Sequence, residues 1–338
     1  MAAYTTIDNP ELYFQCKLYT GNGTNDTAQT FDGDENMQPN MTWIKSRSAT
    51  ENHHVFDSVR GANKRLLTNT TGTEFDDSSN LQSFDSDGFT LGTADGINKN
   101  TATFVCWGWK ESATAGFDIV SFTGNGSART ISHSLSAKPE FFVVKSRTFG
   151  EQWECYSKTI GATKCLQWDD NSAEADIAGR FNDTEPTTSV FTVGDADAVN
   201  KSSETYITYL WRSVQGFSKM GQFKGTGNIN GTFVYTGFRP AYIMCKRTDS
   251  TGSWYICDNK RLGFNARPNN SVVGNPELTA HDSRSEAGGN TNVMDILSNG
   301  FKLIQSGAEI NASGGTFIYM AYAEQPFVNS NGIPANAR

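Results

Sequence analysis

Three lysines occupy the same place in three similar segments of the sequence. Each ends a short apolar run that opens with a proline six positions earlier: Lys45, Lys145 and Lys246. A lysine at the end of an inner strand can lay its methylene groups along the apolar layer and extend its ammonium group into solvent. We expect these ammonium groups to pair with acids of the following strand, such as Asp57 and Asp258, although the middle segment carries Ser157 there. The alternative is a cation-lined binding groove that is repeated three times.

Two short turns carry several carboxylates and are candidate calcium sites. Asp85 and Asp87 precede Gly88 in the stretch DSDG, and more acids lie in the stretch FDGDE at 31–35. Calcium prefers oxygen ligands, and acids crowded into one turn can supply several of them. The same pattern is typical of an Asx turn, in which the carboxylate accepts backbone hydrogen bonds. Of the two turns, we rank Asp85 and Asp87 first as metal ligands because theirs has a glycine at the bend.

A tryptophan beside polar side chains is a candidate platform for a sugar. Trp168 has no tryptophan counterpart in the other two segments, and Asp169, Asp170 and Asn171 follow it. An exposed aromatic ring can stack on a pyranose while neighbouring amides and carboxylates hydrogen-bond its hydroxyl groups. We therefore predict a glycan-binding site at Trp168, Asp169 and Asn171. Five other tryptophans occupy strand positions that the segments share, which favours core packing: Trp43, Trp107, Trp153, Trp211 and Trp254.

No residue is predicted to be catalytic. The ExDxxE motif of concanavalin-type glucanases is absent, because Glu174 and Asp176 are followed by no acid until Asp183. The sequence also lacks GxSxG, HExxH and P-loop motifs. Its six cysteines show no CxxC spacing, which argues against zinc, and no cofactor is expected. His53 and His54 adjoin the start of a predicted strand, where a solvated turn is the simplest interpretation.

The composition favours strands and turns over helices. The 338 residues include 32 glycines and only 37% hydrophobic residues, and asparagine, serine and threonine are abundant. These small polar residues compete with the helical backbone, so we predict an all-β protein. The net charge of -8, without a basic stripe, disfavours nucleic acid as a partner. No apolar run is long enough to cross a bilayer and no secretory signal is evident, so we expect synthesis and folding in a cytosol and no membrane insertion.

Five sequence blocks recur in the same order three times. The blocks fit, in turn, a glycine turn, a proline-led central strand, a second strand, a short strand and an asparagine-led turn that feeds a long strand. The third copy is longer because of a loop rich in glycine, asparagine and serine at 262–296. In the second copy the blocks are FTGNG (122–126), PEFFVVKSR (139–147), WECYS (153–157), TSVFTVG (188–194) and NKSSETYITYLW (200–211).

These repeats predict three tandem antiparallel β-sandwiches of about 100 residues, jelly-roll or lectin-like, each with its own apolar interior. The two ends of the chain are either attachment segments, which add a strand to a neighbour or wrap around it, or plain frayed ends. The predicted bounds are an N-terminal arm (1–15), repeats at 16–115, 116–216 and 217–323, and a C-terminal tail (324–338).

The repeated motifs resemble those of a family of marine bacteriophage structural proteins. They are TGNG, P-x-x-(V/I)-K-x-R, W-x-x-Y/C-D, the asparagine-led strand block and the ending INASGGTFIYMAYAEQPF…PANAR. Members are usually labelled tail-fibre or receptor-binding-like proteins, or domains of unknown function, and are thought to be similar to concanavalin-type lectin sandwiches. The resemblance spans essentially the whole chain and implies no catalytic residue.

The resemblance implies a non-enzymatic virion protein, assembled in the host cytoplasm, with a tail fibre or host-recognition role. The alternatives are a head decoration or head fibre protein, or a dedicated glycan-binding module. The partners it implies are other virion proteins, further copies of the chain in a homotrimer, and glycans of the host cell surface.

Overall fold

The computed structural model describes residues 3–261, 277–286 and 293–335. The all-β prediction is confirmed, since 41% of the residues lie in strands and 6% in short helices. No described helix is long and apolar enough to span a bilayer. Most of the loop at 262–296, which lengthens the third copy, lies outside the described residues.

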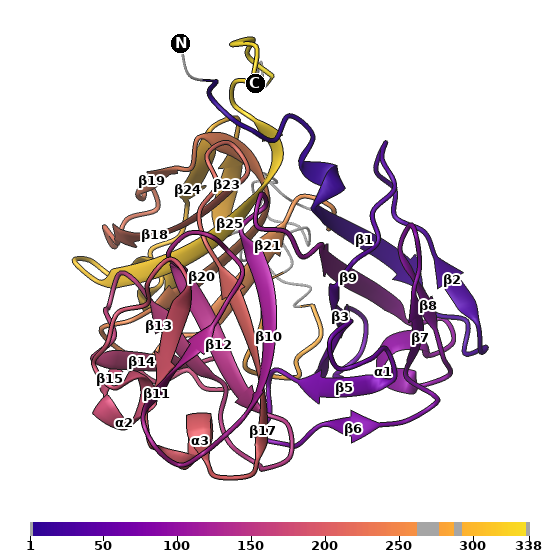
Figure 1. Cartoon of the computed structure of the whole chain (residues 1–338). Helices are drawn as coiled ribbons and strands as arrows, with labels where there is room; N and C mark the ends of the chain where they lie inside the picture. The colour runs from indigo at the N-terminus through magenta and orange to yellow at the C-terminus, as the bar shows by residue number, and fades with distance from the viewer. Residues whose placement is uncertain (1–2, 262–276, 287–292, 336–338) are drawn as a thin grey trace.

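Figure 1 shows three bodies around a common centre: unit 1 (β1–β9) in indigo and purple, unit 2 (β10–β17) in magenta and pink, and unit 3 (β18–β25) in orange to yellow.

Each unit contains one large antiparallel sheet, and the three sheets have corresponding strand orders. In unit 1 the order is β1 (Phe14–Thr20), β9 (Thr103–Trp109), β3 (Met41–Ser46), β4 (His53–Asp57), β5 (Lys64–Leu67) and β6 (Phe75–Asp76). In unit 2 it is β10 (Phe117–Thr123), β17 (Thr205–Trp211), β12 (Phe141–Ser146), β13 (Glu154–Ser157), β14 (Lys164–Gln167) and β15 (Ala175–Asp176). In unit 3 it is β18 (Ser218–Lys224), β25 (Thr316–Pro326), β20 (Phe238–Arg247), β21 (Trp254–Asp258) and β22 (Leu278–Thr279).

A small sheet covers one face of each large sheet. The small sheets are β2 (Thr27–Gln29), β8 (Phe89–Leu91) and β7 (Leu81–Phe84) in unit 1, β11 (Arg129–Ser132) and β16 (Val190–Val193) in unit 2, and β19 (Phe233–Tyr235), β24 (Gly300–Leu303) and β23 (Met294–Leu297) in unit 3. The helices are η1 (Pro10–Leu12), α1 (Asp95–Asn98), α2 (Ala178–Phe181), α3 (Asp197–Asn200) and α4 (Ala308–Asn311).

A local apolar core fills the space between the two sheets of each unit. In unit 1, Ile44 and Phe104 of the large sheet pack with Leu81 and Phe89 of the small one. Each unit repeats one stacked aromatic pair, with ring centroids 5.1 to 5.2 Å apart: Tyr19–Phe104, Phe122–Tyr206 and Phe223–Phe317. The recurrence of the same rings in the same geometry explains why these blocks are alike in sequence.

The repeated asparagines bind the glycine turns to the long strands. Asn98 ends α1, is buried, donates from Nδ2 to the Gly92 carbonyl at 2.8 Å and accepts from the Asn22 amide at 3.0 Å. Asn200 and Asn311 make the corresponding bonds in units 2 and 3. A side chain that both donates and accepts is needed here, because the turn and the helix end leave backbone groups of both kinds unpaired.

A fourth core is shared by all three units. The face of each large sheet that points away from its small sheet packs against the other two large sheets, and we call this shared interior the central core. It includes Trp43 and Trp107 of unit 1, Trp211 of unit 2 and Trp254 of unit 3, all buried. The predicted tryptophan packing is confirmed. The expectation that each unit buries only its own interior was incomplete, because each large sheet is buried on both faces.

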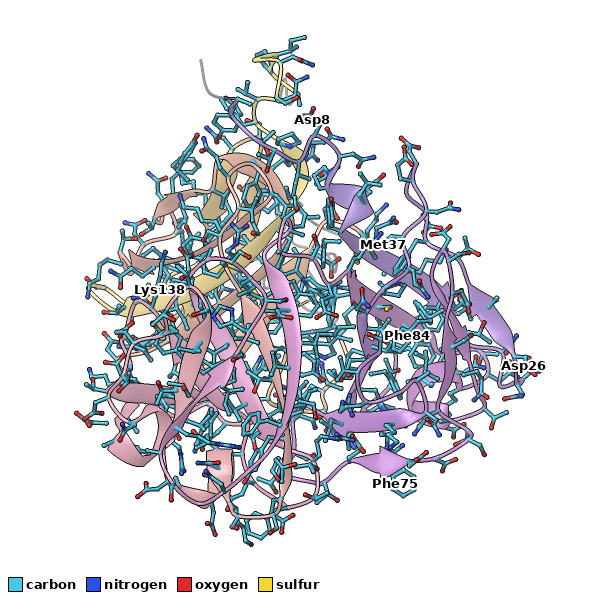
Figure 2. All side chains as sticks on the ribbon, viewed as in Figure 1. Asp8, Asp26, Met37, Phe75, Phe84 and Lys138 are labelled. Atoms are coloured by element: carbon cyan, nitrogen blue, oxygen red, sulfur yellow. The ribbon has the colours of Figure 1, made fainter. Side chains whose placement is uncertain are left out.

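The chain ends pack onto this body. Ile7 of the N-terminal arm lies in the central core, and the Tyr4 hydroxyl donates to the Gly237 carbonyl at 2.8 Å. Asp8 accepts a hydrogen bond from the Ser330 amide at 2.6 Å, so the two ends of the chain meet at the top of Figure 2. Strand β1 begins two residues before the predicted first repeat, and β25 runs past the predicted end of the third.

Candidate functional site

The repeated lysines lie inside the molecule, where neighbouring units meet. We call these contact regions junctions 1/2, 2/3 and 3/1. Lys145 of unit 2 donates from Nζ to the Thr71 carbonyl of unit 1 at 3.0 Å, and Lys246 of unit 3 donates to the Ser172 carbonyl of unit 2 at 2.9 Å. Lys45 donates to the carbonyl of the next residue at 2.7 Å. All three residues have a relative exposure of 0%: Lys45, Lys145 and Lys246.

The expectation that these ammonium groups extend into solvent and pair with acids of the next strand is therefore wrong. Because the large sheets are covered on both faces, a lysine at the strand end meets the neighbouring unit and not water. Burial lowers the pKa of all three amines to about 8, while nearby acids partly oppose that shift. The ammonium groups are still charged at neutral pH, and backbone carbonyl groups compensate for their lost hydration.

Asp57, one of the expected lysine partners, forms a buried cluster at junction 1/2. Its carboxylate pairs with the guanidinium of Arg60, three residues later, and accepts from the Tyr209 hydroxyl of unit 2 at 2.6 Å. Both side chains of the ion pair are 0% exposed. Burial disfavours the charge of Arg60, but Asp57, Tyr209 and Glu74 together outweigh it and raise the pKa of the guanidinium.

Asp258 repeats the arrangement at junction 3/1. It accepts from Arg261 Nε at 2.6 Å and from the Trp107 indole of unit 1 at 3.0 Å. Again the arginine follows its aspartate by three positions and both side chains are buried. Trp107 and Tyr209 are equivalent by register, since each pairs with the residue two positions before its unit's repeated lysine.

Junction 2/3 has no such ion pair. Ser157 stands at the aspartate position and Ile160 at the arginine position, and unit 3 contributes Met320 where the other junctions have Tyr209 and Trp107. Ser157 and Met320 line the same small cavity, of about 10 Å³. The acid, the arginine and the donor of the neighbouring unit are therefore present together or absent together. The spacing D-x-x-R at 57–60 and 258–261, against SKTI at 157–160, was a signal that the sequence analysis missed.

A main-chain hydrogen bond is also repeated at every junction. The three donor–acceptor pairs, each 2.7 to 2.8 Å apart, are Glu74 N–Arg147 O, Glu174 N–Thr248 O and Glu286 N–Arg47 O. At two of the junctions the same residues form an ion pair as well: Arg147–Glu74 at 2.9 Å and Arg47–Glu286 at 2.8 Å. The three units are thus joined by corresponding contacts in a closed ring.

Trp168, the predicted sugar platform, lies in the central core. It is 1% exposed, and its ring centroid is 4.9 Å from that of Trp43. The prediction that its ring is exposed is wrong. Thr68 and Ala280 occupy the corresponding positions of units 1 and 3, as the matching main-chain bonds to β4 and β21 show. These three positions meet in the central core, where one large and two small side chains fill the space. The absence of a tryptophan from the other two segments therefore indicated a shared interior.

The two polar residues of the predicted glycan site are also engaged inside the molecule, Asp169 within unit 2 and Asn171 at junction 2/3. Asp169 accepts from the Trp153 amide at 3.0 Å, and the Asn171 carbonyl accepts from Lys246 Nζ at 3.2 Å. Burial raises the pKa of Asp169. The Asn171 carbonyl therefore holds the end of β14 against unit 3, Asp169 fixes Trp153 within unit 2, and neither residue borders an exposed ring.

The candidate metal ligands lie in the turn between β7 and β8. Asp85 accepts from the Ser83 hydroxyl at 2.6 Å and the Thr90 hydroxyl at 2.7 Å, and Asp87 accepts from the Met37 amide at 3.2 Å. The carboxylates are thus engaged by two hydroxyl groups and by the amide of a residue distant in sequence, and none of these is the local backbone bond of an Asx turn. Across the described ranges, no group of three or more His, Cys, Asp or Glu side chains could hold a metal ion.

The two adjacent histidines belong to β4 and are not in a solvated turn. His53 is 0% exposed and its Nδ1 accepts from the Trp43 indole at 2.9 Å, whereas His54 points to the other face of the sheet and is 3% exposed. Burial holds the pKa of His53 well below its ordinary value and lowers that of His54 to about 3. The expected solvated turn is wrong because β4, like β3, is covered on both faces.

One known family matches nearly the whole chain. Its description is "Domain of unknown function (DUF7483)", and the match covers residues 9–326. The chain belongs to the DUF7483 family. The matched segment includes all three large sheets and all three junctions, so the family unit is the whole ring.

Other comparisons add little about this DUF7483 chain. No curated protein matches it. Among solved structures, a viral major capsid protein, "Crystal Structure of the STIV MCP", is 10% identical, with a TM-score of 0.23, over 60% of this chain and 97% of that one. A likeness of this size identifies neither fold nor function.

Three hollows lined by described residues of the DUF7483 chain are small, with volumes of about 70, 10 and 10 Å³. One lies between the N-terminal segment and unit 3, has a volume of about 70 Å³, and is lined by Glu11, Phe14, Ala241 and Lys260 among others. Small-molecule sites are usually several times larger, so this hollow has room for a few water molecules only.

Proposed function

We propose that this DUF7483 chain is a non-enzymatic structural protein of a bacteriophage virion. The observation that carries the proposal is the place of the repeated polar residues. The lysines, aspartates and arginines that could do chemistry are buried at the junctions and bonded to neighbouring segments. Groups used in this way stabilise a rigid body and are closed to a substrate. The resemblance of the repeated motifs to marine bacteriophage structural proteins supports the same role.

Within that role, we propose that the chain is displayed on the particle as a tail-fibre or host-recognition component, with a head decoration or head fibre protein as the alternative. It is assembled in the host cytoplasm, and other virion proteins are its partners. The homotrimer stays a prediction. Three units already pack around one core within a single chain, so the threefold arrangement of the fold does not depend on further copies.

The proposal is tested on purified particles of the phage that encodes the chain. Mass spectrometry of gradient-purified virions is expected to detect the chain, and gold-labelled antibody is expected to mark the tail. Label confined to the head lattice would favour the decoration role. A chain found only in the soluble fraction of the lysate, and never on particles, would contradict the proposal.

The non-enzymatic part of the proposal has its own test. Purified chain is incubated with capsule polysaccharide of the host, and reducing ends are measured over time. We expect no increase above a boiled control. A steady, protein-dependent release of reducing ends would show a depolymerase and overturn this part of the proposal.

A further inference from the structure

Strand β19 of unit 3 presents two aromatic side chains to solvent. Phe233 is 45% exposed and Tyr235 is 47% exposed, whereas Val234 between them is buried in the local core. Residues two apart in a strand share one face of the sheet, so both rings lie on its outer side. Ile229, in the turn before the strand, is 70% exposed. Figure 1 places β19 at the outer edge of unit 3, away from the junctions.

The fold does not require rings at these positions. The small sheets can be aligned on the phenylalanine that recurs in β24, β8 and β16. In this alignment Phe233 corresponds to Ala28 in unit 1 and Thr130 in unit 2, and Tyr235 corresponds to Ser132. Units 1 and 2 form the same small sheet with small or polar residues there. Exposed aromatic side chains that the core does not use indicate a contact surface.

Polar groups surround the rings on the same face. Lys302 lies directly opposite Phe233 on β24, and Asp295 lies opposite Lys302 on β23. Directly opposite residues of antiparallel strands share a face, so ring, ammonium and carboxylate form one row. Lys302 also contacts the Asn230 side chain. Among the described residues, Asp295 Oδ1 meets no hydrogen-bond partner, but it is buried, so Asp295 contributes charge to this row and no exposed acceptor at that atom.

The strand edge at Tyr235 is occupied. Gly300 is the residue opposite Tyr235, and the Phe233 ring lies close to it, with Cε2 3.2 Å from the position that a Cβ would take. Lys219 of β18 lies 5.3 Å from the Tyr235 ring centroid and donates to the Tyr235 carbonyl at 2.8 Å. An added peptide strand would need that carbonyl as an acceptor, so strand addition is disfavoured. A purely apolar protein surface would take Lys302 out of water and leave its other N–H groups unpaired, with Asn230 as its partner among the described residues.

We propose that the outer face of the β19–β24–β23 sheet binds glycans, with Phe233 and Tyr235 stacking on pyranose rings and Lys302 and Asn230 bonding their hydroxyl groups. Two lysines against one aspartate make the face cationic on a chain of net charge -8, so sugars that carry carboxylates bind more tightly than neutral ones. The inference rests on the proposed display of the chain on the virion, and it names the class of molecule that this surface would recognise.

The test is a glycan array of neutral and uronic-acid-containing oligosaccharides, with calorimetric titration of the sugars that bind. The double variant Phe233→Thr/Tyr235→Ser carries the residues of unit 2 at the same positions and is expected to weaken binding about tenfold or more. Phe75→Ala is the matched control. Phe75 is 48% exposed on β6 of unit 1 and lies at the periphery in Figure 2, so its loss should leave glycan affinity unchanged.

Equal unfolding midpoints for all three proteins would show that the substitutions leave the fold intact. No binding by the unsubstituted chain at millimolar sugar would overturn the proposal, and so would equal affinities of that chain and the double variant. Self-association that the double variant abolishes, without glycan binding, would assign the face to a second copy and would also overturn it. None of these results bears on whether the chain is part of the virion, which the particle analysis decides separately.

Discussion

Junctions 1/2 and 3/1 differ from junction 2/3 in one buried cluster. The first two contain an aspartate, an arginine and a donor from the neighbouring unit, whereas the third contains Ser157, Ile160 and Met320. The backbone around the clusters corresponds, because the repeated main-chain bond is present at all three junctions. The buried ion pair is therefore not needed to form a junction. An uncharged set of residues occupies the same place in the same molecule.

The comparison shows how a buried charge is retained. A buried ion pair contributes little net stability relative to a well-packed apolar group, but removal of one partner alone is costly. Loss of one member would leave the others buried without a partner, so the three residues are expected to be replaced together and not singly. That is the pattern in this chain, where acid, arginine and neighbouring donor occur together at two junctions and are replaced together at the third.

The largest expected effect comes from removing the acid alone. Asp258→Ala removes the nearer carboxylate of the buried Arg261 and leaves it Glu286 at 3.4 Å, so the free energy of unfolding should fall by an amount toward the lower end of about 3–5 kcal/mol. The matched change Ser157→Ala at junction 2/3 should cost less than about 1 kcal/mol. Urea unfolding followed by circular dichroism measures both. Equal losses would mean that the two junction types do not differ energetically.

Removal of a junction lysine should have a somewhat smaller effect. Lys145→Met leaves the Thr71 carbonyl of unit 1 without its donor, and we expect a loss of about 2–3 kcal/mol in the free energy of unfolding. Lys138→Met, at an exposed position, is the control and should change stability by less than about 0.5 kcal/mol.

The Lys145→Met variant should also differ from the unsubstituted chain in how its stability changes with pH in alkaline solution. Burial lowers the pKa of Lys145 from 10.5 to about 8, so between these values the unfolded chain holds a proton that the folded chain has released. The contribution of this lysine to stability therefore rises with pH across that window. Lys145→Met should show a smaller rise than the unsubstituted chain, and an identical rise would contradict the assigned burial.

Acid should weaken junction 3/1 more than the other two. His53 stands there in the place of Trp153 and Trp254, whose indoles donate to the neighbouring units' carbonyls at 3.0 and 2.8 Å. Burial lowers the pKa of His53, so below its ordinary value of 6.5 the unfolded chain takes up a proton that the folded chain refuses. Stability is lost as pH falls, by about 1–2 kcal/mol from this residue between pH 7 and pH 5. His53→Gln should reduce that loss in unfolding curves at the two pH values, and an unchanged loss would exclude His53 as its source.

The smallest expected effect is that of exchanging the whole cluster. Asp57→Ser, Arg60→Ile and Tyr209→Met together give junction 1/2 the residues of junction 2/3. We expect the triple variant to unfold within about 1.5 kcal/mol of the unsubstituted chain. If it unfolds as readily as Asp57→Ser alone, the three positions do not act as a set.

The sequence predicted the strands and the recurrence of their blocks, but not which faces meet. In β3 and β12 every residue is buried, so the alternation of polar and apolar residues that would reveal the register is missing. Ile44 and Val143, for instance, occupy similar positions in the sequences of their blocks. Yet Ile44 faces a local core and Val143 faces the central core, because the register makes Val144 the counterpart of Ile44.

The candidate sites were predicted poorly for a related reason. Residue type indicated that Lys145 and Trp168 were unusual, but they contact Thr71 and Trp43 of another unit, at distances along the sequence that no local pattern encodes. The arginines three positions after Asp57 and Asp258 could have been found by comparing the repeats. The role of Tyr209 could not, because it depends on how two large sheets pack.

The central core is tested most directly by native-state hydrogen exchange of the whole chain. If the three large sheets share one interior, the slowest amides in β9, β17 and β25 should exchange with the same free energy of opening, equal to that of global unfolding. Substituting Trp168 by alanine should then lower all three values together. Three distinct opening energies, with only the β17 value responding to the loss of Trp168, would show three separately stable sandwiches and contradict the account.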